Sequence, residues 1–185
     1  MKPFYILILL SIIALTNINL SCHHCYGPYV PVKVSSQALT HLDNRGIMPR
    51  VLHPGEQGWR EAYGFRLSAF SEIQNPLDTV DVECPEYQTN PYPTGLAIVT
   101  RTGMGPDYPP GADVSAFFKN VAFNGRYFDI YVGRVGVTWS YPGVSFLDFL
   151  LVRPPTAPGW QQFEMFFQQS DSTSFSVVTD SIYLQ

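Results

Sequence analysis

Short runs of alternating apolar and polar positions make up most of the chain after residue 29. The clearest run is Glu61 to Ile73. Side chains two residues apart lie on the same face of a β-strand, so a period of two predicts a strand with one buried face. Arg66 and Ser68 would then lie on the opposite, solvent-facing side. The apolar positions of this run are Tyr63, Phe65, Leu67 and Ala69.

Further strands are predicted wherever similar runs are separated by Gly, Pro, Asn or Asp. The last two are expected to form a hairpin across residues 170–172. Residues 35–58 are expected to be a long connection with turns, because Pro49 and Pro54-Gly55 interrupt them. The additional predicted strands cover residues 30–34, 95–101, 126–137, 144–152, 161–168 and 175–184.

Residues 114–123 fit two structures. Val114, Phe117, Phe118 and Val121 would share one face of a short helix, with Asp113 available to cap it, but the run could also form a strand. With only this one candidate helix, parallel α/β folds are disfavoured. About seven or eight short strands predict an all-β fold, a single antiparallel β-sandwich that is immunoglobulin-like or of a related topology.

The N-terminus has the features of a secretory leader. Lys2 supplies a positive charge, and Phe4 to Leu15 form an apolar run that is too short to span a bilayer. We therefore expect residues 1–21 to be a signal peptide, residues 22–29 a tether, and residues 30–185 the folded domain.

The end of this leader, Leu20-Ser21-Cys22, resembles a bacterial lipobox, in which a small residue precedes the cysteine that receives lipid. Asn19 departs from the usual pattern, in which an aliphatic residue stands three positions before the cysteine. The resemblance implies that Cys22 is acylated, with palmitate-like chains. Two or more such chains would hold the protein at the membrane permanently, whereas one chain would hold it only marginally.

The chain has three cysteines, an odd number that leaves one thiol unexplained in an exported protein. If Cys22 carries lipid, Cys25 and Cys84 remain as a candidate disulfide in an oxidising compartment. Closing that loop would stabilise the fold by roughly 4 kcal/mol in the chain-entropy model. Two alternatives use the segment Cys22-His23-His24-Cys25, namely a redox CxxC motif and a zinc or copper site.

Composition restricts the classes of partner. The chain has 185 residues, with 11 Lys and Arg against 15 Asp and Glu, for a formal charge of -4. A nucleic-acid-binding surface needs an excess of cations, so a nucleic-acid partner is disfavoured. Apolar residues make up 45% of the chain, which is enough for a genuine core.

Sequence motifs give no support for an enzyme. The chain lacks a G-x-S-x-G motif, and His41 and His53 belong to no metal-binding pattern and lie in segments expected to be turns. A pair of carboxylates could hydrolyse glycosides, and Asp129 and Asp148 are candidates because both are predicted to lie within strands. No cofactor is expected. Other strand carboxylates are Glu61, Glu72 and Glu164.

An acidic loop after the strand 61–73 offers a weak calcium site. Carboxylate oxygens gathered in a loop suit Ca²⁺, although the spacing does not match an EF-hand. A solvated acidic loop is the simpler interpretation. The candidate ligands are Asp78, Asp81 and Glu83, near Asn75 and Glu86.

Aromatic residues in predicted loops are the strongest candidates for ligand contact. Several stand beside proline, and two tryptophans, Trp59 and Trp160, flank glycine. Rigid aromatic side chains could stack on sugars or anchor a protein partner, although they could equally close the ends of a sandwich. The residues proposed to bind a ligand are Tyr92, Tyr108, Trp139 and Tyr141.

Several segments resemble uncharacterised lipoproteins of Bacteroidota, namely residues 43–46 with Pro49, residues 61–67 and the terminal residues 179–184. The resemblance implies a lipoprotein of the bacterial cell envelope, anchored by Cys22 in the outer membrane and facing the periplasm or the cell surface. The expected function is a non-enzymatic binding or assembly module with an unknown protein or glycan ligand. The alternatives are a carbohydrate-binding accessory protein and, less favoured, a glycosidase-type hydrolase.

Overall fold

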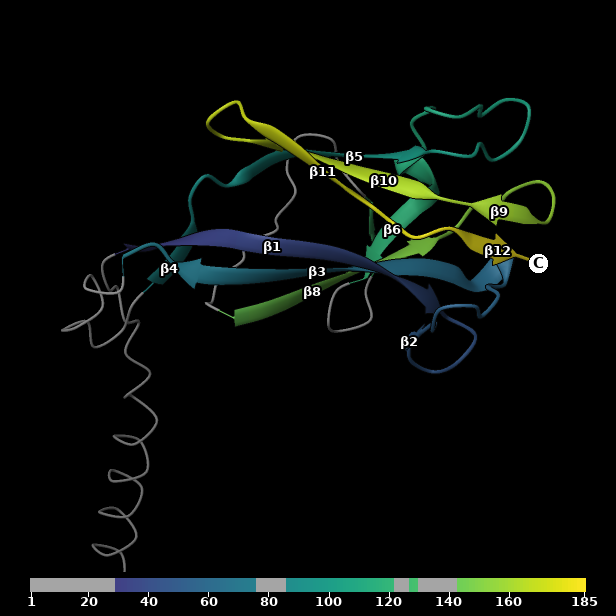
Figure 1. The fold of residues 1–185 in the computed structure, drawn as a ribbon, viewed down its shortest axis with the longest axis horizontal. Coiled ribbons are helices and arrows are strands. Elements are labelled where there is room, and N and C mark those ends of the chain that lie inside the picture. Colours follow the sequence, from purple (N-terminus) through teal and green to yellow (C-terminus); the bar gives the residue numbers. More distant parts are fainter. Residues whose placement is uncertain (1–28, 76–85, 122–126, 130–142) are drawn as a thin grey trace, which may run out of the picture.

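Two β-sheets face each other across one apolar core (Figure 1). The computed structural model describes residues 29–75, 86–121, 127–129 and 143–185. The larger sheet has seven strands in the order β2-β1-β3-β8-β6-β7, with β4 beside β1. The smaller sheet has three strands in the order β11-β10-β5, and a two-stranded sheet of β12 and β9 lies at the end that carries the C-terminus. The all-β, sandwich-like fold expected from the sequence is confirmed.

The strands differ widely in length. The large sheet contains β1 (Tyr29–Asp43), β2 (Arg50–Val51), β3 (Tyr63–Ile73), β4 (Glu86–Thr89), β6 (Phe118–Val121), β7 (Tyr127–Asp129) and β8 (Gly143–Leu151). The other two sheets contain β5 (Pro93–Thr100), β9 (Gly159–Gln161), β10 (Phe163–Gln169), β11 (Ser174–Val178) and β12 (Ile182–Leu184). Short 3₁₀ turns, η1 (Arg60–Ala62) and η3 (Ser115–Phe117), precede β3 and β6. Several of these strands are only two or three residues long, which is why the described residues hold more strands than the sequence predicted.

Strand β3 lies at the centre of the large sheet and has the predicted two-residue period. Antiparallel neighbours, β1 and β8, pair with it along almost its whole length. Arg66 and Ser68 lie on the opposite face, as expected. The predicted inward set, Tyr63, Phe65, Leu67 and Ala69, is buried.

Aromatic rings fill the space between the two sheets. The ring of Phe65 on β3 lies 4.9 Å from that of Phe118 on β6, 5.5 Å from Phe149 on β8 and 6.1 Å from Phe163 on β10, measured between centroids. Phe118 also meets Phe163 edge-to-face. Burying each such side chain stabilises the fold by about 1.5–3 kcal/mol. This cluster therefore joins three strands of the large sheet to the middle strand of the small one.

The first strand is much longer than predicted. β1 continues from Tyr29 to Asp43, so the expectation of a long connection beginning at residue 35 was wrong. Two features hid the strand from sequence inspection. A register irregularity between Val34 and Ser36 breaks the period of two, and the inward positions beyond it include polar Gln37 and His41.

The described part of the segment 114–123, which ends at Val121, is not an α-helix. Residues Ser115–Phe117 form the single turn η3, and Phe118–Val121 then pair with β8 as strand β6. Asp113 does bind the following backbone, since its Oδ1 accepts the N–H of Ser115 at 2.8 Å. Pairing with β8 buries Phe118 in the aromatic core, and this gain outweighs the weak helical pattern.

The predicted final strand, residues 175–184, divides into two. β11 pairs with β10 as the expected hairpin, but its ladder ends at Thr179, whose N–H donates to the carbonyl of Phe163 and whose Oγ1 accepts the N–H of Phe163. The chain then crosses to another sheet, where β12 pairs with β9.

The β1–β4 pair is parallel, an exception to the antiparallel arrangement that was predicted. Tyr29 lies opposite Glu86, and Val32 lies opposite Thr89. The chain therefore enters both strands from the same end. Cys25 and Cys84 precede these two strands by only a few positions and lie outside the described residues, so their disulfide stays a prediction.

Gly64 provides a test of how tightly β3 and β8 approach each other. A Cβ at this position would lie 2.6 Å from the carbonyl oxygen of Phe149 and 2.6 Å from Cδ2 of Leu150. We expect Gly64→Ala to lower the free energy of unfolding by about 1–3 kcal/mol, because backbone must move to admit the methyl group. Urea denaturation would measure the change. Gly159→Ala is the matched control, since nothing lies within 4 Å of its added Cβ, and an equal loss in both variants would contradict this explanation.

Candidate functional site

The last strand, β12, lies between β9 and the segment that contains Gly58. Tyr183 is paired with Trp160 on β9. On the other side, the N–H of Gly58 donates to the carbonyl of Tyr183 at 3.0 Å, and the N–H of Gln185 donates to the carbonyl of Gly58 at 3.0 Å. The C-terminal residues are thus held on both sides by backbone hydrogen bonds.

Alternation along these segments determines which side chains face outward. Ile182 and Leu184 are buried in the core, so Tyr183 between them faces away from it. A Cβ added to Gly58 would contact the side chains of Leu184 and Ile182, so position 58 also faces the core. Trp59 is therefore directed outward, on the same side as Tyr183 and Trp160. We call Trp59, Trp160 and Tyr183, together with Arg45, the aromatic surface.

Each tryptophan of the aromatic surface is exposed but held by a neighbour. Trp160 is 63% exposed, and its ring packs edge-to-face on Tyr183 with 5.7 Å between centroids. Trp59 is 41% exposed, and the guanidinium of Arg45 lies 4.9 Å from the centroid of its ring. A cation over an aromatic face is attracted by the ring quadrupole, so this contact restrains both side chains.

Asp43 fixes the position of Arg45. Both carboxylate oxygens accept hydrogen bonds from the Arg45 guanidinium, the shortest at 2.6 Å. The bond from Arg45, with a further contribution from Arg50, lowers the pKa of Asp43 against the opposing effect of its burial. Asp43 therefore stays ionised at neutral pH and keeps Arg45 over Trp59.

The aromatic surface has the composition of a protein-binding site. Trp, Tyr and Arg are the residues most enriched among those that contribute most of the binding energy of protein interfaces. Restrained rings lose less conformational freedom on binding than free ones. Among the described residues, no group of three or more His, Cys, Asp or Glu is placed to hold a metal ion.

The aromatic residues proposed from the sequence do not form one site. Tyr92 is half exposed in the turn before β5, whereas Tyr108 lies in the loop beyond the other end of that strand. The Tyr108 ring packs edge-to-face on Phe117, below the guanidinium of Arg153. Trp139 and Tyr141 lie outside the described ranges. The sequence drew attention to Trp59 and Trp160, but only the position of β12 places them on one surface.

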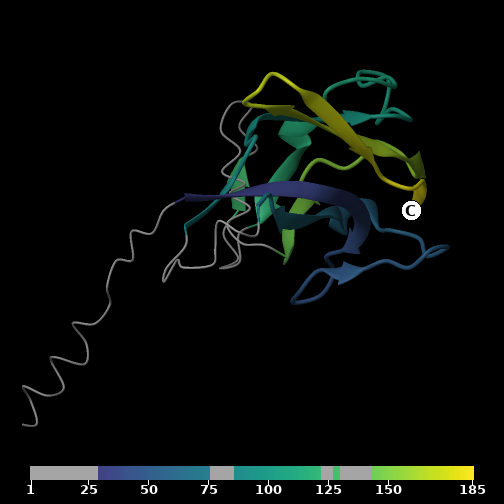
Figure 2. The ribbon, with the colours of Figure 1, turned by 60° about the vertical axis from the view of Figure 1, so that its left-hand side comes forward.

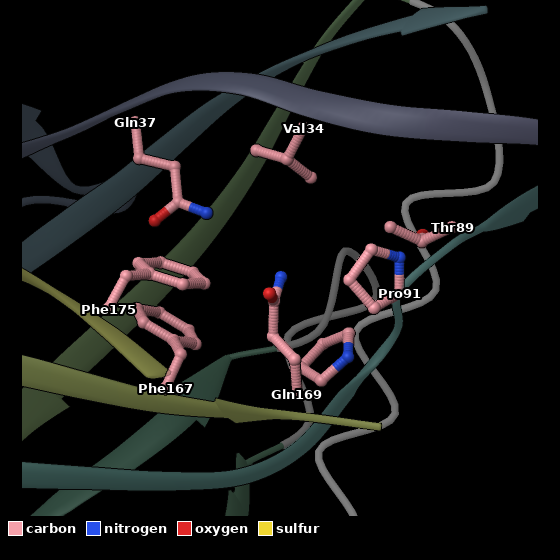
Figure 3. Close-up of a pocket in the computed structure, with 8 residues that line it drawn as sticks. Val34, Gln37, Thr89, Pro91, Phe167, Gln169 and Phe175 are labelled. Atoms are coloured by element: carbon pink, nitrogen blue, oxygen red, sulfur yellow. The ribbon is translucent and has the colours of Figure 1, made fainter. Parts of the chain in front are cut away.

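A small pocket opens between the sheets near the start of β1 (Figure 3). The stacked rings of Phe167 and Phe175 form its floor, and the amides of Gln37 and Gln169 point into it. Its interior has room for about one water molecule. Gln37 Oε1 is buried without a protein partner. Pro91 and Pro93, on either side of Tyr92, line the same pocket.

Among the described residues, no two of the candidate catalytic carboxylates are seen to face each other across a site. Asp148 accepts two hydrogen bonds from the Arg66 guanidinium, at 2.6 and 2.8 Å, on the outer side of the large sheet. Glu164 is bound by Arg101 at 2.7 Å, and hydrogen bonds from Ser176 and Arg101 lower its pKa. The backbone of Asp129 is paired with Lys119, but its side chain is not described. The calcium candidates Asp78, Asp81 and Glu83 and the acylation candidate Cys22 also lie outside the described residues.

The two histidines in the described part of the chain, His41 and His53, differ in environment. His53 lies in an exposed turn, as predicted, where its backbone N–H donates to Glu56 Oε2. For His41 the expectation of a turn was wrong, because it is an inward position of β1 whose Nδ1 lies 2.8 Å from the hydroxyl of Tyr63. Burial raises the pKa of Tyr63 and lowers that of His41, so a protonated phenol can donate to a neutral imidazole.

Comparison with protein-family profiles and with curated proteins identifies no family for this chain. No protein-family profile and no curated protein matches its sequence. The described residues contain no helix that is both long and apolar enough to cross a membrane.

The partly buried His41 predicts acid sensitivity. Because burial lowers the pKa of His41 below its unfolded value of 6.5, folding favours the neutral ring. Its contribution to stability is complete above that value and is lost as the pH falls from 6.5 through the lowered pKa of the folded state. We expect the free energy of unfolding to decrease from pH 7 to pH 5, and to decrease less in His41→Gln. His53→Gln is the control, and chemical denaturation at each pH is the measurement. Parallel curves for wild type and His41→Gln would contradict the assignment.

Proposed function

We propose that the protein is a lipoprotein of the bacterial cell envelope that binds another protein through the aromatic surface. The observation that most supports this proposal is the pair of exposed tryptophans, Trp59 and Trp160, each restrained by a neighbouring side chain. In this proposal the protein is non-enzymatic, and its role is binding or assembly. Acylation of Cys22 would anchor it in the outer membrane, with the domain facing the periplasm or the cell surface.

The layout of β1 suits a tethered binding module. This strand begins with Tyr29, the first described residue, at one end of the molecule, and the C-terminus lies at the other (Figure 1). Fifteen residues of extended chain span roughly 50 Å. β1 ends at Asp43, which holds Arg45 in the aromatic surface. An anchor at Cys22 would therefore leave the aromatic surface free to meet a partner.

The described carboxylates favour binding over catalysis. A glycosidase needs one carboxyl group with a raised pKa to act as an acid. Asp148 instead has both oxygens bound by Arg66, and the pKa of Glu164 is lowered. These carboxylates are committed to neighbouring cations on the surfaces of the sheets.

A protein partner is favoured over a glycan by the position of Arg45. Sugars stack on a free aromatic face, whereas one face of Trp59 is covered by this guanidinium. In addition, Tyr92 and Tyr108 lie at opposite ends of β5 and cannot form a joint platform. Carbohydrate binding remains the second candidate, and a glycan array with a Trp160→Ala control would test it.

The anchor and the disulfide can be tested by one measurement. The intact mass of the protein purified from its own membranes should match residues 22–185 plus acyl chains. Cys25 and Cys84 should react with an alkylating reagent only after reduction. The parallel β1–β4 register supports this pairing, because the two cysteines precede adjacent strands. A mass without acyl chains would refute the anchor, and alkylation before reduction would refute the disulfide.

The aromatic surface predicts a site-specific cross-link. A photo-crosslinking phenylalanine analogue in place of Tyr183 should yield a discrete protein adduct in intact cells. Trp160→Ala in the same chain should reduce the adduct several-fold, since the tryptophan would no longer anchor the partner. The same analogue at Phe166, an exposed position on β10, is the matched control and should give none. Equal adducts at both positions, or no change on removing Trp160, would contradict the proposal.

A further inference from the structure

The large sheet has an apolar outer face that the small sheet does not cover. On β3 and β8, Phe70 is paired with Val144, and Ser68 is paired with Phe146. Directly paired residues of antiparallel strands share a face, and Ala69 between Ser68 and Phe70 is buried on the other one. Phe70, Val144 and Phe146 are 40%, 59% and 58% exposed. They form an exposed apolar patch on the outer face.

A second apolar group lies beyond the end of β1. Ile47 and Met48, in the loop between β1 and β2, are 104% and 79% exposed, the highest values among the exposed large apolar side chains of the described residues. In both views of the molecule, the segment around β2 extends on the side of the large sheet that faces away from the small sheet (Figures 1 and 2). The two groups are therefore presented on the same side of the molecule.

Four charged residues on the outer face of β1, β3 and β8 lie opposite a residue of the other sign. Lys33 on β1 lies opposite Glu72 on β3, and Arg66 binds Asp148 at 2.6 Å. The Arg66 guanidinium also lies 5.3 Å from the centroid of the Phe146 ring. Although the whole chain carries a formal charge of -4, these four groups sum to zero. These four groups therefore add no net repulsion when the face approaches an anionic surface.

We propose that this face lies on the lipid bilayer, with Phe70, Val144 and Phe146 at one contact and Ile47 and Met48 at the other. The inference rests on the proposed acylation of Cys22. Cys22 precedes Tyr29, the first residue of β1, by seven positions, and seven extended residues reach at most about 25 Å. A tether of that length keeps the outer face close to the membrane. A flat bilayer can meet both apolar groups at once because they lie on one side of the sheet.

This second contact would fix the orientation of the domain. An acyl anchor alone leaves a domain free to rotate about its tether, whereas apolar side chains that enter the interface add a second, oriented attachment. With the outer face on the bilayer, the small sheet faces away from it. β1 then runs along the membrane, and the aromatic surface is presented laterally.

Photolabelling by lipids tests this orientation. The acylated full-length product would be reconstituted into vesicles of phosphatidylethanolamine and phosphatidylglycerol that contain a lipid with a diazirine in its acyl chain. After irradiation and digestion with trypsin and Asp-N, labels are expected in the peptide 46–50 and in the peptide 135–147, which contain the two apolar groups. The peptides 148–170 and 171–179 are the internal controls, because Phe166 and Val178 in the small sheet are 40% and 41% exposed.

Paired substitutions sharpen the test. Val144→Ser with Phe146→Ser should reduce labelling of the peptide 46–50 several-fold, although the substitutions lie elsewhere, because one face makes both contacts. Phe166→Ser with Val178→Ser should leave that labelling unchanged. Equal labelling of the peptides 148–170 and 171–179, labels confined to residues before 29, or a cross-link between two copies through Phe146 would overturn the proposal.

The anchor is checked first, by intact mass, so that the two proposals fail separately. An acylated protein without labels in the two peptides overturns the membrane-facing surface and leaves the anchor intact. If the protein carries no acyl chain, the anchor fails, and the same vesicles are used in a sedimentation assay. Binding that Val144→Ser with Phe146→Ser abolishes would support the surface, and absence of binding would overturn it.

Discussion

The contact of Phe65 with Phe118, Phe149 and Phe163 is the interaction on which the arrangement of the two sheets depends. These rings come from β3, β6, β8 and β10, so they set the order in which strands can pack across the core. Neither sheet buries its inner face without the other. The apolar patch of Phe70, Val144 and Phe146 lies on β3 and β8, two of the strands that this cluster holds.

The sequence was informative where a strand is regular and central, and less so at the edges of the fold. β3 could be predicted because buried and exposed residues alternate along it without interruption. β1 could not be predicted in full, since the irregularity at Val34 and the polar residues Gln37 and His41 break the pattern. β12 was joined to β11 in the prediction because the bonds of Thr179 that separate them depend on β10, which is distant in the sequence. Local patterns carry no information about such partners.

The residues of the candidate site could likewise be predicted from the sequence only in part. Aromatic residues beside turns were recognised as ligand candidates from composition alone, and Trp59 and Trp160 were among those noted. Their shared surface depends on β12, which lies between them through one parallel and one antiparallel pairing. Tyr92 and Tyr108 had an equally suggestive local sequence, but β5 separates them. Residue type indicated which side chains could bind a ligand, and tertiary pairing decided which of them act together.

The length of β1 has a mechanical consequence. This strand leads from the tethered end of the domain towards the aromatic surface and is bonded to β3 over most of its fifteen residues. Tension between an anchored N-terminus and a partner bound at the far end would act along the strand axis. The hydrogen bonds of the β1–β3 ladder would then be strained in shear, all at once, instead of opening one after another like a zipper. A domain pulled in this direction resists extension with its longest ladder, which suits a protein that connects a membrane to a second body.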